Sequence, residues 1–520
     1  LGLSLRSCGN NLPALGIALT VFALLFDFLK RRKSWSRYPP GPTSLPFIGT
    51  MLQIDFHNPH LSFTQLSKKY GNVFSLQNCW RNLIVVNGFK AVKEALVQKS
   101  EDFADRPYFP IYEHLGFGEN SEGVVFARYS RTWKEQRRFA LSTLRNFGMG
   151  KKSLEQRVTK EAGFLCSAIC SEKGCPFDPH FLINNAVSNV ICSLIYGERF
   201  DYDNKKFQRL LHLFEQALNE ETGFLSQLLI VVPLLLRIPG VPQSIFRSQK
   251  KVLDFIDELL KEHKTTWNLT QKRDFIDAFL QEIEKAKEHA GSSFNDNNLC
   301  MVTFDLFSAG TETTSTTLRW ALLYMLLHPD IQCKGHRGRA DQRGCQWGFF
   351  PGKVHEEIDK VIGRDRSPQM EDLVNMPYTN AVIHEIQRYG DIAPVGVPHM
   401  TYRDTELQGF FIPKGMTVIF NLSSVLKDEM VWEKPHQFYP EHFLDADGQF
   451  VKREAFLPFS AGRRACLGEQ LARMELFLFF TSLLQHFTFH LPEGQARPRE
   501  VGHFAVTLAP HPYQIQAVPR

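Results

Sequence analysis

Hydrophobic residues recur along most of the chain at the three- and four-residue spacing of helices that bury one face. Three stretches are instead rich in β-branched and aromatic residues and predict short strands. They cover residues 72–77 (NVFSLQ), 82–88 (NLIVVNG) and 406–426 (ELQGFFIPKGMTVIFNLSSVL). The pattern therefore predicts a mainly α fold with a small β-sheet region.

The first 38 residues have a different pattern. Residues 12–29 (LPALGIALTVFALLFDFL) are almost continuously apolar, over the roughly 18 residues needed to cross a hydrocarbon core. Basic residues follow at once, and such charges keep their flank in the cytosol. A cleavable signal peptide is the competing interpretation, but its charges would precede the apolar run, and no Ala-x-Ala site is found. We expect residues 1–38 to form an uncleaved N-terminal membrane anchor with a basic flank.

Pro39, Pro40, Gly41 and Pro42 form a stiff segment that separates this anchor from the rest. No repeat or second linker follows, so residues 39–520 are predicted to form a single domain. The composition, with 43% hydrophobic residues and 44 phenylalanines, suffices for a core that encloses a cofactor. The net charge of +5 is mild for 520 residues and argues against nucleic acid as a partner.

One cysteine lies in an unusual context, the spacing Phe459-x-x-Gly462-x-Arg464-x-Cys466-x-Gly468. Against a haem, Gly462 would allow close approach or a positive φ. Arg464 would pair with a propionate, and Phe459 would shield the sulfur from water. Cys466 would ligate the iron as a thiolate, which the start of the following helix favours. An isolated cysteine is more often a small core residue, but this surrounding pattern favours the ligand.

A second unusual stretch, residues 304–320 (FDLFSAGTETTSTTLRW), places polar groups inside an otherwise apolar helix. Ala309 and Gly310 would leave room above the iron, while Glu312 and Thr313 would hold water and pass protons to bound oxygen. A helix with a solvent-facing polar side is the alternative, but apolar residues on several faces weaken it.

The spacing around Cys466 resembles the haem-binding signature of the cytochrome P-450 monooxygenases, and residues 39–520 are similar to the animal microsomal family 2, above all subfamily D. The resemblance implies the P-450 fold, with haem b between a distal helix and a proximal cysteine loop. It also implies insertion of one oxygen atom from O2 into lipophilic xenobiotic or endogenous small molecules. The chain has no G-x-G-x-x-G fingerprint after a strand, so electrons from NADPH must arrive through a reductase.

The same resemblance assigns further haem contacts. Trp133 and Arg137, one helical turn apart, resemble the propionate-binding pair of the family. His399 is expected to add another donor.

Glu385 and Arg388 are also one turn apart, a spacing that alone indicates a surface ion pair. In the family this pair is a buried structural clasp, completed here by residues 440–443. His442 stands where many relatives have arginine, so the third partner is expected to be weaker or pH-dependent.

Substrate contacts follow from subfamily D, many of whose members favour lipophilic basic amines. Asp305 shares a helical face with Ala309, and a buried acid there needs either a backbone N–H partner or a cation on the substrate. Glu215 is a second candidate acid, although Gln216 is the closer positional match. Phe504 and Val506 are expected to form part of the apolar wall.

The expected partners are membrane-bound. The resemblance implies an endoplasmic reticulum location with the catalytic domain facing the cytosol, and docking of the NADPH-dependent reductase, with cytochrome b5 as a further candidate. The candidate docking residues lie on the cysteine side and are equally well explained as solvated charge: Lys134, Arg138, Lys452 and Arg453. Residues 228–242 are expected to dip into membrane lipid, with core packing as the alternative.

Residues 333–353 (CKGHRGRADQRGCQWGFFPGK) have no helical period and interrupt the family pattern. Cys333, His336 and Cys345 do not match a zinc pattern. We interpret the tract as an insertion. The alternative to an active enzyme is therefore a catalytically silent splice or prediction variant of the same fold, disabled by this insertion.

Overall fold

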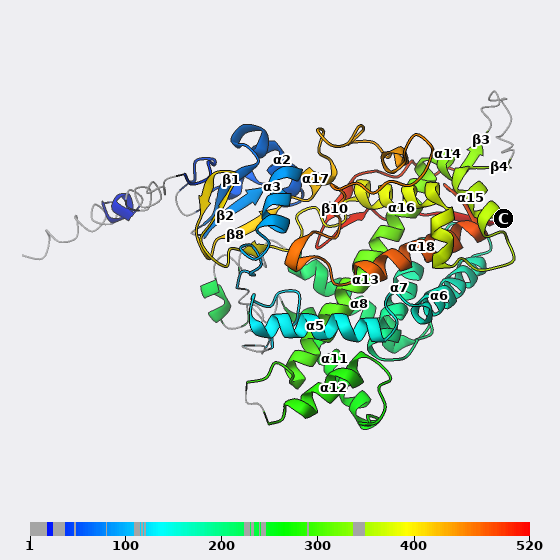
Figure 1. Ribbon diagram of the computed structural model, residues 1–520, viewed down its shortest axis with the longest axis horizontal. Coiled ribbons are helices and arrows are strands. Elements are labelled where there is room, and N and C mark those ends of the chain that lie inside the picture. Colours follow the sequence, from blue (N-terminus) through cyan, green and yellow to red (C-terminus); the bar gives the residue numbers. More distant parts are fainter. Residues whose placement is uncertain are drawn as a thin grey trace, which may run out of the picture.

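The computed structural model describes residues 18–23, 26, 37–45, 48–79, 81–108, 115, 118, 121–222, 229, 233–238, 240, 246–288, 291–335 and 349–520. Helices dominate, as predicted, and surround a long central helix (Figure 1). They are α2 (Pro59–Tyr70), α3 (Phe89–Lys93), α5 (Arg131–Asn146), α6 (Lys152–Ser171), α7 (His180–Ile195), α8 (Lys205–Thr222), α11 (Arg247–Thr265), α12 (Phe275–Ala286), α13 (Asp296–Leu327), α14 (Pro329–Gln332), α15 (Lys353–Val361), α16 (Pro377–Gly390), α17 (Ser423–Leu426) and α18 (Glu469–His486).

Short helical turns connect several of these helices. The 3-10 turns are η1 (Met51–Gln53), η3 (Pro233–Arg237), η4 (Met370–Asn375), η5 (Pro440–Phe443) and η6 (Gly462–Arg464). A π-helical turn, η2 (Glu94–Gln98), continues α3.

The strands form one four-stranded sheet and several two-stranded ribbons. In the sheet, β1 (Val73–Asn78) pairs antiparallel with β2 (Arg81–Val86), β2 parallel with β8 (Thr417–Phe420), and β8 antiparallel with β5 (His399–Met400). The ribbons join β3 (Cys333–Gly335) to β4 (Phe349–Pro351), β6 (Thr405–Leu407) to β7 (Phe410–Ile412), β10 (Gly502–Phe504) to β11 (Leu508–Pro510), and β9 (Phe487–His490) to β12 (Gln516–Pro519).

The predicted strands are confirmed except at one end. Residues 406–426 form β6, β7 and β8, but the last four residues form the short helix α17. Strand β8 ends at Phe420 and is followed by Asn421, whose side-chain amide donates to the carbonyl of His60 (3.1 Å) and to the side chain of Asn87 (2.8 Å).

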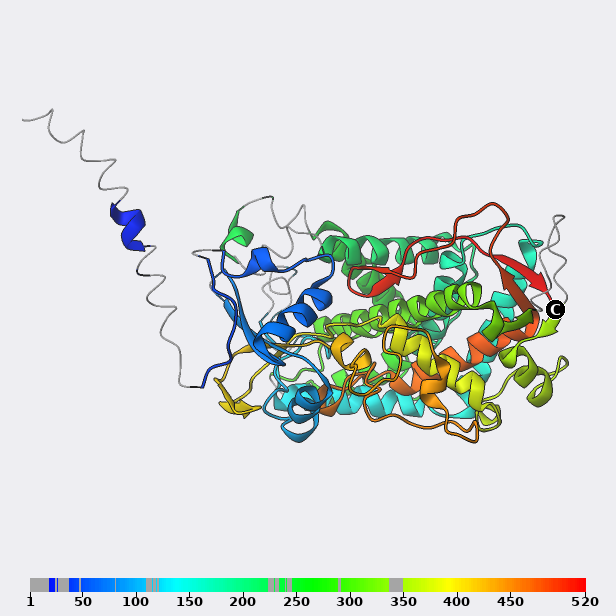
Figure 2. The ribbon, with the colours of Figure 1, turned by 90° about the horizontal axis from the view of Figure 1, so that it is seen from above.

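The long helix α13, of 32 residues, passes through the helical part of the molecule (Figure 2). Its closest neighbour is α7. A Cβ atom on Gly310 would lie 2.5 Å from Cδ1 of Ile191 on α7, so this glycine is needed for helix packing. The sequence had suggested room above the iron as its role.

Two hydrophobic cores hold this architecture together. The larger one joins the helices from α5 to α18, and the smaller one packs the four-stranded sheet against α3 and α17. The segment with Cys466 leads from the smaller core into α18. The predicted site therefore lies where the sheet region meets the helical region.

Three predictions fall wholly or partly outside the described residues. Most of the predicted anchor does so, and among the described residues no helix has the length and hydrophobicity to span a bilayer. Most of 228–242 lies outside as well, apart from η3 and a few single residues. In the predicted insertion, β3 and β4 pair antiparallel, while His336 and Cys345 are not described.

Candidate haem site

The cysteine loop is closed by its own backbone. The amide of Cys466 donates to the carbonyl of Phe459 (3.0 Å), and α18 begins three residues later with Gly468 as its cap. The Cys466 side chain is exposed, unlike the buried thiols of Cys166 and Cys192. This geometry leaves the sulfur accessible to a ligand.

The thiol of Cys466 is not a preformed thiolate in the protein alone. Desolvation by the surrounding protein raises its pKa, and the backbone amides of Gly468 and Glu469 and the charge of Arg137 oppose this only in part. The amides at the helix start thus lower the pKa of Cys466, as predicted, but the effect of desolvation is larger. A metal ion at the sulfur would supply the missing positive charge, because a coordinating thiol is deprotonated outright.

Gly462 adopts a positive φ of 74°. A Cβ atom at this position would overlap the carbonyl oxygen of Leu96 in η2. The glycine therefore fits the cysteine loop against η2, one of the two roles that the sequence suggested.

Three arginines gather beside this loop, and every hydrogen bond that the structure shows from their guanidinium groups goes to a backbone carbonyl. Arg464 donates to Ala104 (2.7 Å) and Ala127 (2.6 Å). Arg137 donates to Ala465 (2.5 Å). Arg106, which lies between η2 and α5, donates to the carbonyls of Val125, Val397 and Pro398.

Among the described residues, this cluster carries more positive than negative charge, because Asp105, which raises the pKa values of Arg106 and Arg464, is also paired with Arg128 (2.6 Å). Burial and then the charge of Arg106 lower the pKa of Arg464 to about 8, and burial and Arg137 lower that of Arg106 to about 9. The Nη1 atom of Arg464 is buried without a hydrogen-bond partner in the described part of the chain. The cluster thus fits the two propionates of a haem, because a buried cation needs a paired anion.

Arg106 was not found by sequence reasoning. It belongs to no spacing motif, and its contribution depends on folding that brings residues 104–106, 125–127 and 397–398 together. No signal in the sequence alone marks it.

Trp133 and His399 lie at the site with their predicted donors already engaged. The indole N–H of Trp133 donates to the carbonyl of Val124 (3.0 Å), and the Arg464 guanidinium lies 3.9 Å above the ring. Nδ1 of His399 lies 2.7 Å from the carbonyl of Phe103 and must donate to it. Burial, followed by the charge of Arg106, holds the pKa of His399 well below its usual range, so its Nε2 is an acceptor here.

On the distal side, Asp305 is buried and anchors a loop. Its Oδ2 accepts from the amides of Val124 (2.7 Å) and Val125 (3.0 Å). A Cβ atom on Gly123, which has a φ of 71°, would lie 2.3 Å from the same oxygen. Burial raises the pKa of Asp305 to about 6, although both amides oppose this. The backbone partner considered from sequence is present.

Further along α13, Ala309 is exposed and Thr313 is partly exposed. The Thr313 hydroxyl donates to the Ala309 carbonyl (2.7 Å). The hydrogen bonds that the structure shows for the Glu312 side chain go to residues other than Thr313. Oε1 of Glu312 accepts from the hydroxyls of Thr507 (2.8 Å) and Thr316 (3.0 Å), and burial raises its pKa.

The other predicted substrate contacts separate into two groups. Glu215 is partly buried and acts electrostatically on His180 and Glu312, so it faces the interior. Gln216 is exposed and lies 2.9 Å from His212. Phe504 and Val506 lie in or beside the turn between β10 and β11, with Val506 44% exposed.

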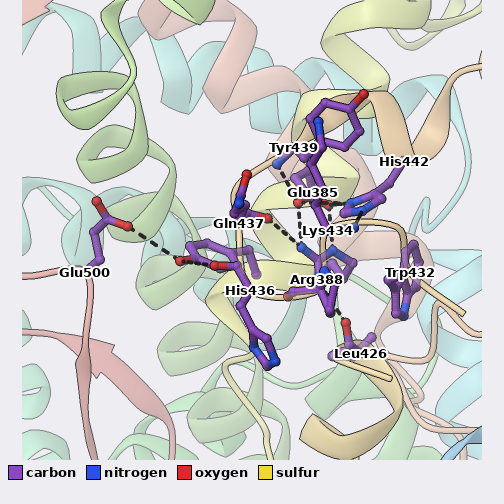
Figure 3. A network of polar contacts seen from close by, with 12 residues as sticks. Glu385, Arg388, Leu426, Trp432, Lys434, His436, Gln437, Tyr439, His442 and Glu500 are labelled. Carbon is purple, nitrogen blue, oxygen red and sulfur yellow. Dashed lines mark hydrogen bonds and ion pairs between the residues drawn. The ribbon is translucent and has the colours of Figure 1, made fainter. Parts of the chain in front are cut away.

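The predicted clasp is present and fully buried (Figure 3). Arg388 binds both carboxylate oxygens of Glu385 at 2.7 Å. Nδ1 of His442 lies 3.2 and 3.3 Å from the same oxygens. Arg388 also donates to the carbonyls of Leu426, Pro435 and Gln437, and thereby fixes the segment that leads to the cysteine loop.

A basic cavity opens on the outer side of this loop, with a volume of about 380 Å³. Two of the predicted docking residues line it. The lining residues are Trp133, Lys134, Arg137, Arg138, Leu141, Ser142, Arg145 and Arg463. Lys452 and Arg453 are exposed but do not line the cavity.

Comparisons with known proteins agree with this geometry. The chain matches the cytochrome P450 family over residues 39–337 and 351–517, and the interruption falls within the predicted insertion. It is 56% identical to cytochrome P450 2D15 of Canis lupus familiaris over 514 residues, covering 98% of this chain and 99% of that protein. It is 57% identical to cytochrome P450 2D14 of Bos taurus over 514 residues and to cytochrome P450 2D6 of Homo sapiens over 511, with the same coverage.

These matches support family 2, subfamily D, as the sequence indicated, and give no support to a catalytically silent variant. Proteins of this family use haem b and O2, with electrons that come from NADPH through a reductase. The chain belongs to the cytochrome P450 family and is a P450 monooxygenase.

Proposed function

We propose that this monooxygenase holds haem b with Cys466 as the axial ligand and Arg106, Arg137 and Arg464 around the propionates. The observation that carries the proposal is the arginine cluster beside an accessible cysteine, in which Arg464 has a buried, unpartnered Nη1. Two propionates would supply the missing anions. Trp133 packs under Arg464 and positions it.

Bound there, the haem would supply an iron able to activate O2, and the Cys466 thiolate would favour cleavage of the O–O bond. Thr313 and Glu312 handle protons on the distal side. The Thr313 hydroxyl, which donates to Ala309, keeps lone pairs that accept a hydrogen bond from water. Glu312 holds a proton at its carboxyl group and returns it to that water.

The ligand assignment is tested by replacing Cys466 with histidine. In the reduced, carbon monoxide-bound protein, we expect the Soret band of Cys466→His to lose its far-red position, because imidazole replaces thiolate. The matched control is Cys170→His, an exposed cysteine on α6, which should keep the parent band. A far-red band in Cys466→His would overturn the assignment.

We propose that the substrates are lipophilic basic amines, with Asp305 as the anchor. Oδ2 of Asp305 is engaged by two amides, while Oδ1 is left to face a substrate cation. The pKa of about 6 means that the carboxylate becomes charged as pH rises through this value. Phe504 and Val506 supply apolar contacts near the oxidised end.

This substrate preference is tested with N,N-dimethyl-4-phenylbutylamine and its neutral isostere, (5-methylhexyl)benzene. Amine affinity, measured by spectral titration, should rise as pH increases through about 6, whereas the isostere should bind equally at each pH. Asp305→Asn keeps an oxygen for the loop amides but loses the charge, so it should remove this dependence. Equal loss of both ligands, with poor haem incorporation, would assign Asp305 a purely structural role.

We propose that electrons come from the NADPH-dependent reductase of the endoplasmic reticulum, which docks at the basic cavity beside the cysteine loop. Arg138→Glu and Arg145→Glu reverse charges on that lining and should raise the reductase concentration for half-maximal turnover. Lys205→Glu, at the start of α8, is the control. The same proposal includes a membrane anchor formed by residues 1–38 and a single domain, residues 39–520, that faces the cytosol. It also includes contact of residues 228–242 with lipid and binding of cytochrome b5.

A further inference from the structure

The carboxylate of Glu312 is held from two directions. Its Oε1 accepts from Thr316, one turn along α13, and from Thr507, which is distant in sequence. Both threonines are buried, with 1% and 4% of their surface exposed. One donor therefore moves with the helix, and the other belongs to the turn between β10 and β11.

This turn is compact and presents apolar groups next to Thr507. The amide of Ala505 donates to the Thr507 carbonyl (2.9 Å), and Phe504 pairs with Leu508 across the ribbon. Val506, adjacent to Thr507, is 44% exposed. A displacement of the apolar side chains of the turn would therefore also move the Thr507 hydroxyl, which is only one to three residues away.

Strand β11 is fixed to α13 along its length, from Leu508, which directly follows Thr507, to Pro510. The indole N–H of Trp320 donates to the carbonyl of Leu508 (2.8 Å), and Nη2 of Arg319 donates to that of Pro510 (3.2 Å). The amide of Leu508 donates to Ile392 (2.9 Å). Strand β11 is thus held by backbone carbonyls from its first residue onward, whereas within residues 504–507 the hydrogen bond to α13 that the structure shows is the one from Thr507 to Glu312.

We propose that Thr507 is a positioning residue that couples the substrate-facing turn 504–507 to the Glu312 carboxylate. With the turn in place, the carboxylate is held toward Thr507 and away from Thr313. When a substrate displaces the turn, Oε1 loses this donor and the side chain is released. The inference rests on the proposed role of Glu312 in handling protons.

The groups around Glu312 link its protonation to its hydrogen bond with Thr507. Burial raises its pKa, the hydroxyls of Thr507 and Thr316 and the cation Arg319 lower it, and Glu215 on α8 raises it. Because a hydroxyl donor favours the charged form of a carboxylate, removal of Thr507 increases the proton affinity of Glu312. Protonation and the position of the turn are then linked, and the linkage acts equally in both directions.

The test uses the haem-loaded ferric protein without substrate. Thr507→Val removes the hydroxyl with little change of shape, and Thr507→Ser restores it. Thr316→Val is the matched control, because it removes the other hydroxyl on Oε1 without affecting the turn. The titration of Glu312 is followed by its infrared carboxyl band, which is identified by its loss in Glu312→Gln. Hydrogen–deuterium exchange gives the protection of amides 502–509 at each pH.

We expect both valine variants to increase the proton affinity of Glu312, by up to about tenfold, and Thr507→Ser to match the parent. Protection of the turn should change with pH at the Glu312 midpoint in the parent and in Thr316→Val. In Thr507→Val, protection of the turn should be lower than in the parent and should not change at the Glu312 midpoint. Unchanged titration in Thr507→Val, or a turn that responds to pH as in the parent, would overturn the inference.

The far-red carbon monoxide band is recorded for every variant. A parent protein without that band would contradict the proposed haem ligation and not the coupling, because neither the infrared nor the exchange measurement requires turnover. A normal band, together with a turn whose protection in the parent protein does not follow the Glu312 titration, would contradict only the proposed role of Thr507.

Discussion

Nδ1 of His442 lies 3.2 Å from Oε2 of Glu385, while Nε2 of the same ring accepts the backbone N–H of Lys434 at 3.1 Å. One nitrogen donates and the other accepts, which is the pattern of a neutral imidazole. The histidine therefore completes the clasp by hydrogen bonding, where an arginine would add a second positive charge beside Glu385.

Removal of this ring should destabilise the protein. His442→Ala leaves the partly buried amide of Lys434 without its acceptor and the buried Glu385 with one donor fewer, at a cost of about 1–3 kcal/mol. We expect a lower midpoint of thermal unfolding and faster haem loss. His436→Ala is the control, because its ring is exposed and lies 3.6 Å from Glu429. Equal effects of the two substitutions would contradict this account.

Gly462 and Gly448 provide a matched pair with the same φ of 74°. A side chain at either position is strained, which costs about 1–2 kcal/mol. At Gly448 a Cβ atom would meet nothing within 4 Å, whereas at Gly462 it would overlap the carbonyl of Leu96. Gly448→Ala should therefore only lower the unfolding midpoint slightly, while Gly462→Ala should also reduce the haem content of the purified protein. Similar haem content in both variants would show that η2 moves to accommodate the new side chain without disturbing the cysteine loop.

Thr313 should control how oxygen is used. Thr313→Ala removes the hydroxyl that donates to Ala309 and, on the proposed mechanism, water at that position loses its partner. We expect the ratio of hydrogen peroxide to oxygenated product to rise several-fold, measured with NADPH consumption in the reconstituted system. Thr313→Ser retains the hydroxyl and should stay near the parent ratio. An unchanged ratio in the alanine variant would count against the relay.

Glu475 on α18 predicts an unusual pH dependence of stability. It is 1% exposed, its Oε2 accepts from Thr314 (3.1 Å), and burial raises its pKa to about 8. The unfolded chain releases this proton near the ordinary pKa of 4.5. The folded form thus binds the extra proton between these values, and stability falls as pH rises through this window.

Glu475→Gln removes this dependence. The variant should gain on the order of 2 kcal/mol at pH 7 relative to the parent, because no proton has to be taken up on folding. Unfolding midpoints at pH 5.5 and 8 are the measurement. Glu469→Gln, at the partly exposed start of α18, should follow the parent. A parallel shift of the Glu475→Gln curve at both pH values would contradict the protonation argument.

Sequence reasoning was effective where local spacing carries the chemistry. The cysteine loop, the helix with Glu312 and the pair Glu385 and Arg388 each lie within one short motif. The structure shows the last pair as a buried ion pair, while the roles of Cys466 and Glu312 stay predictions. The mainly helical fold followed from periodicity for the same reason.

What the sequence could not provide depends on contacts between distant segments. Arg106 joins the arginine cluster through three carbonyls of two separate segments. The partner of Glu312 is Thr507, and the reason for Gly310 is Ile191. Such pairs have no fixed spacing, so neither propensity nor pattern marks them.

The order in which the chain is synthesised places a constraint on this fold. The side chains of Asn87 and Asn421 bond at 2.8 Å across 334 residues, beside the parallel pairing of β2 with β8. At about 5–20 residues per second, β2 waits for its partner for tens of seconds on the ribosome. Its run Leu83–Val86, buried in the finished protein, is an unpaired apolar edge during that time and needs protection from aggregation. Cys466 emerges later still, so haem capture comes near the end of biosynthesis.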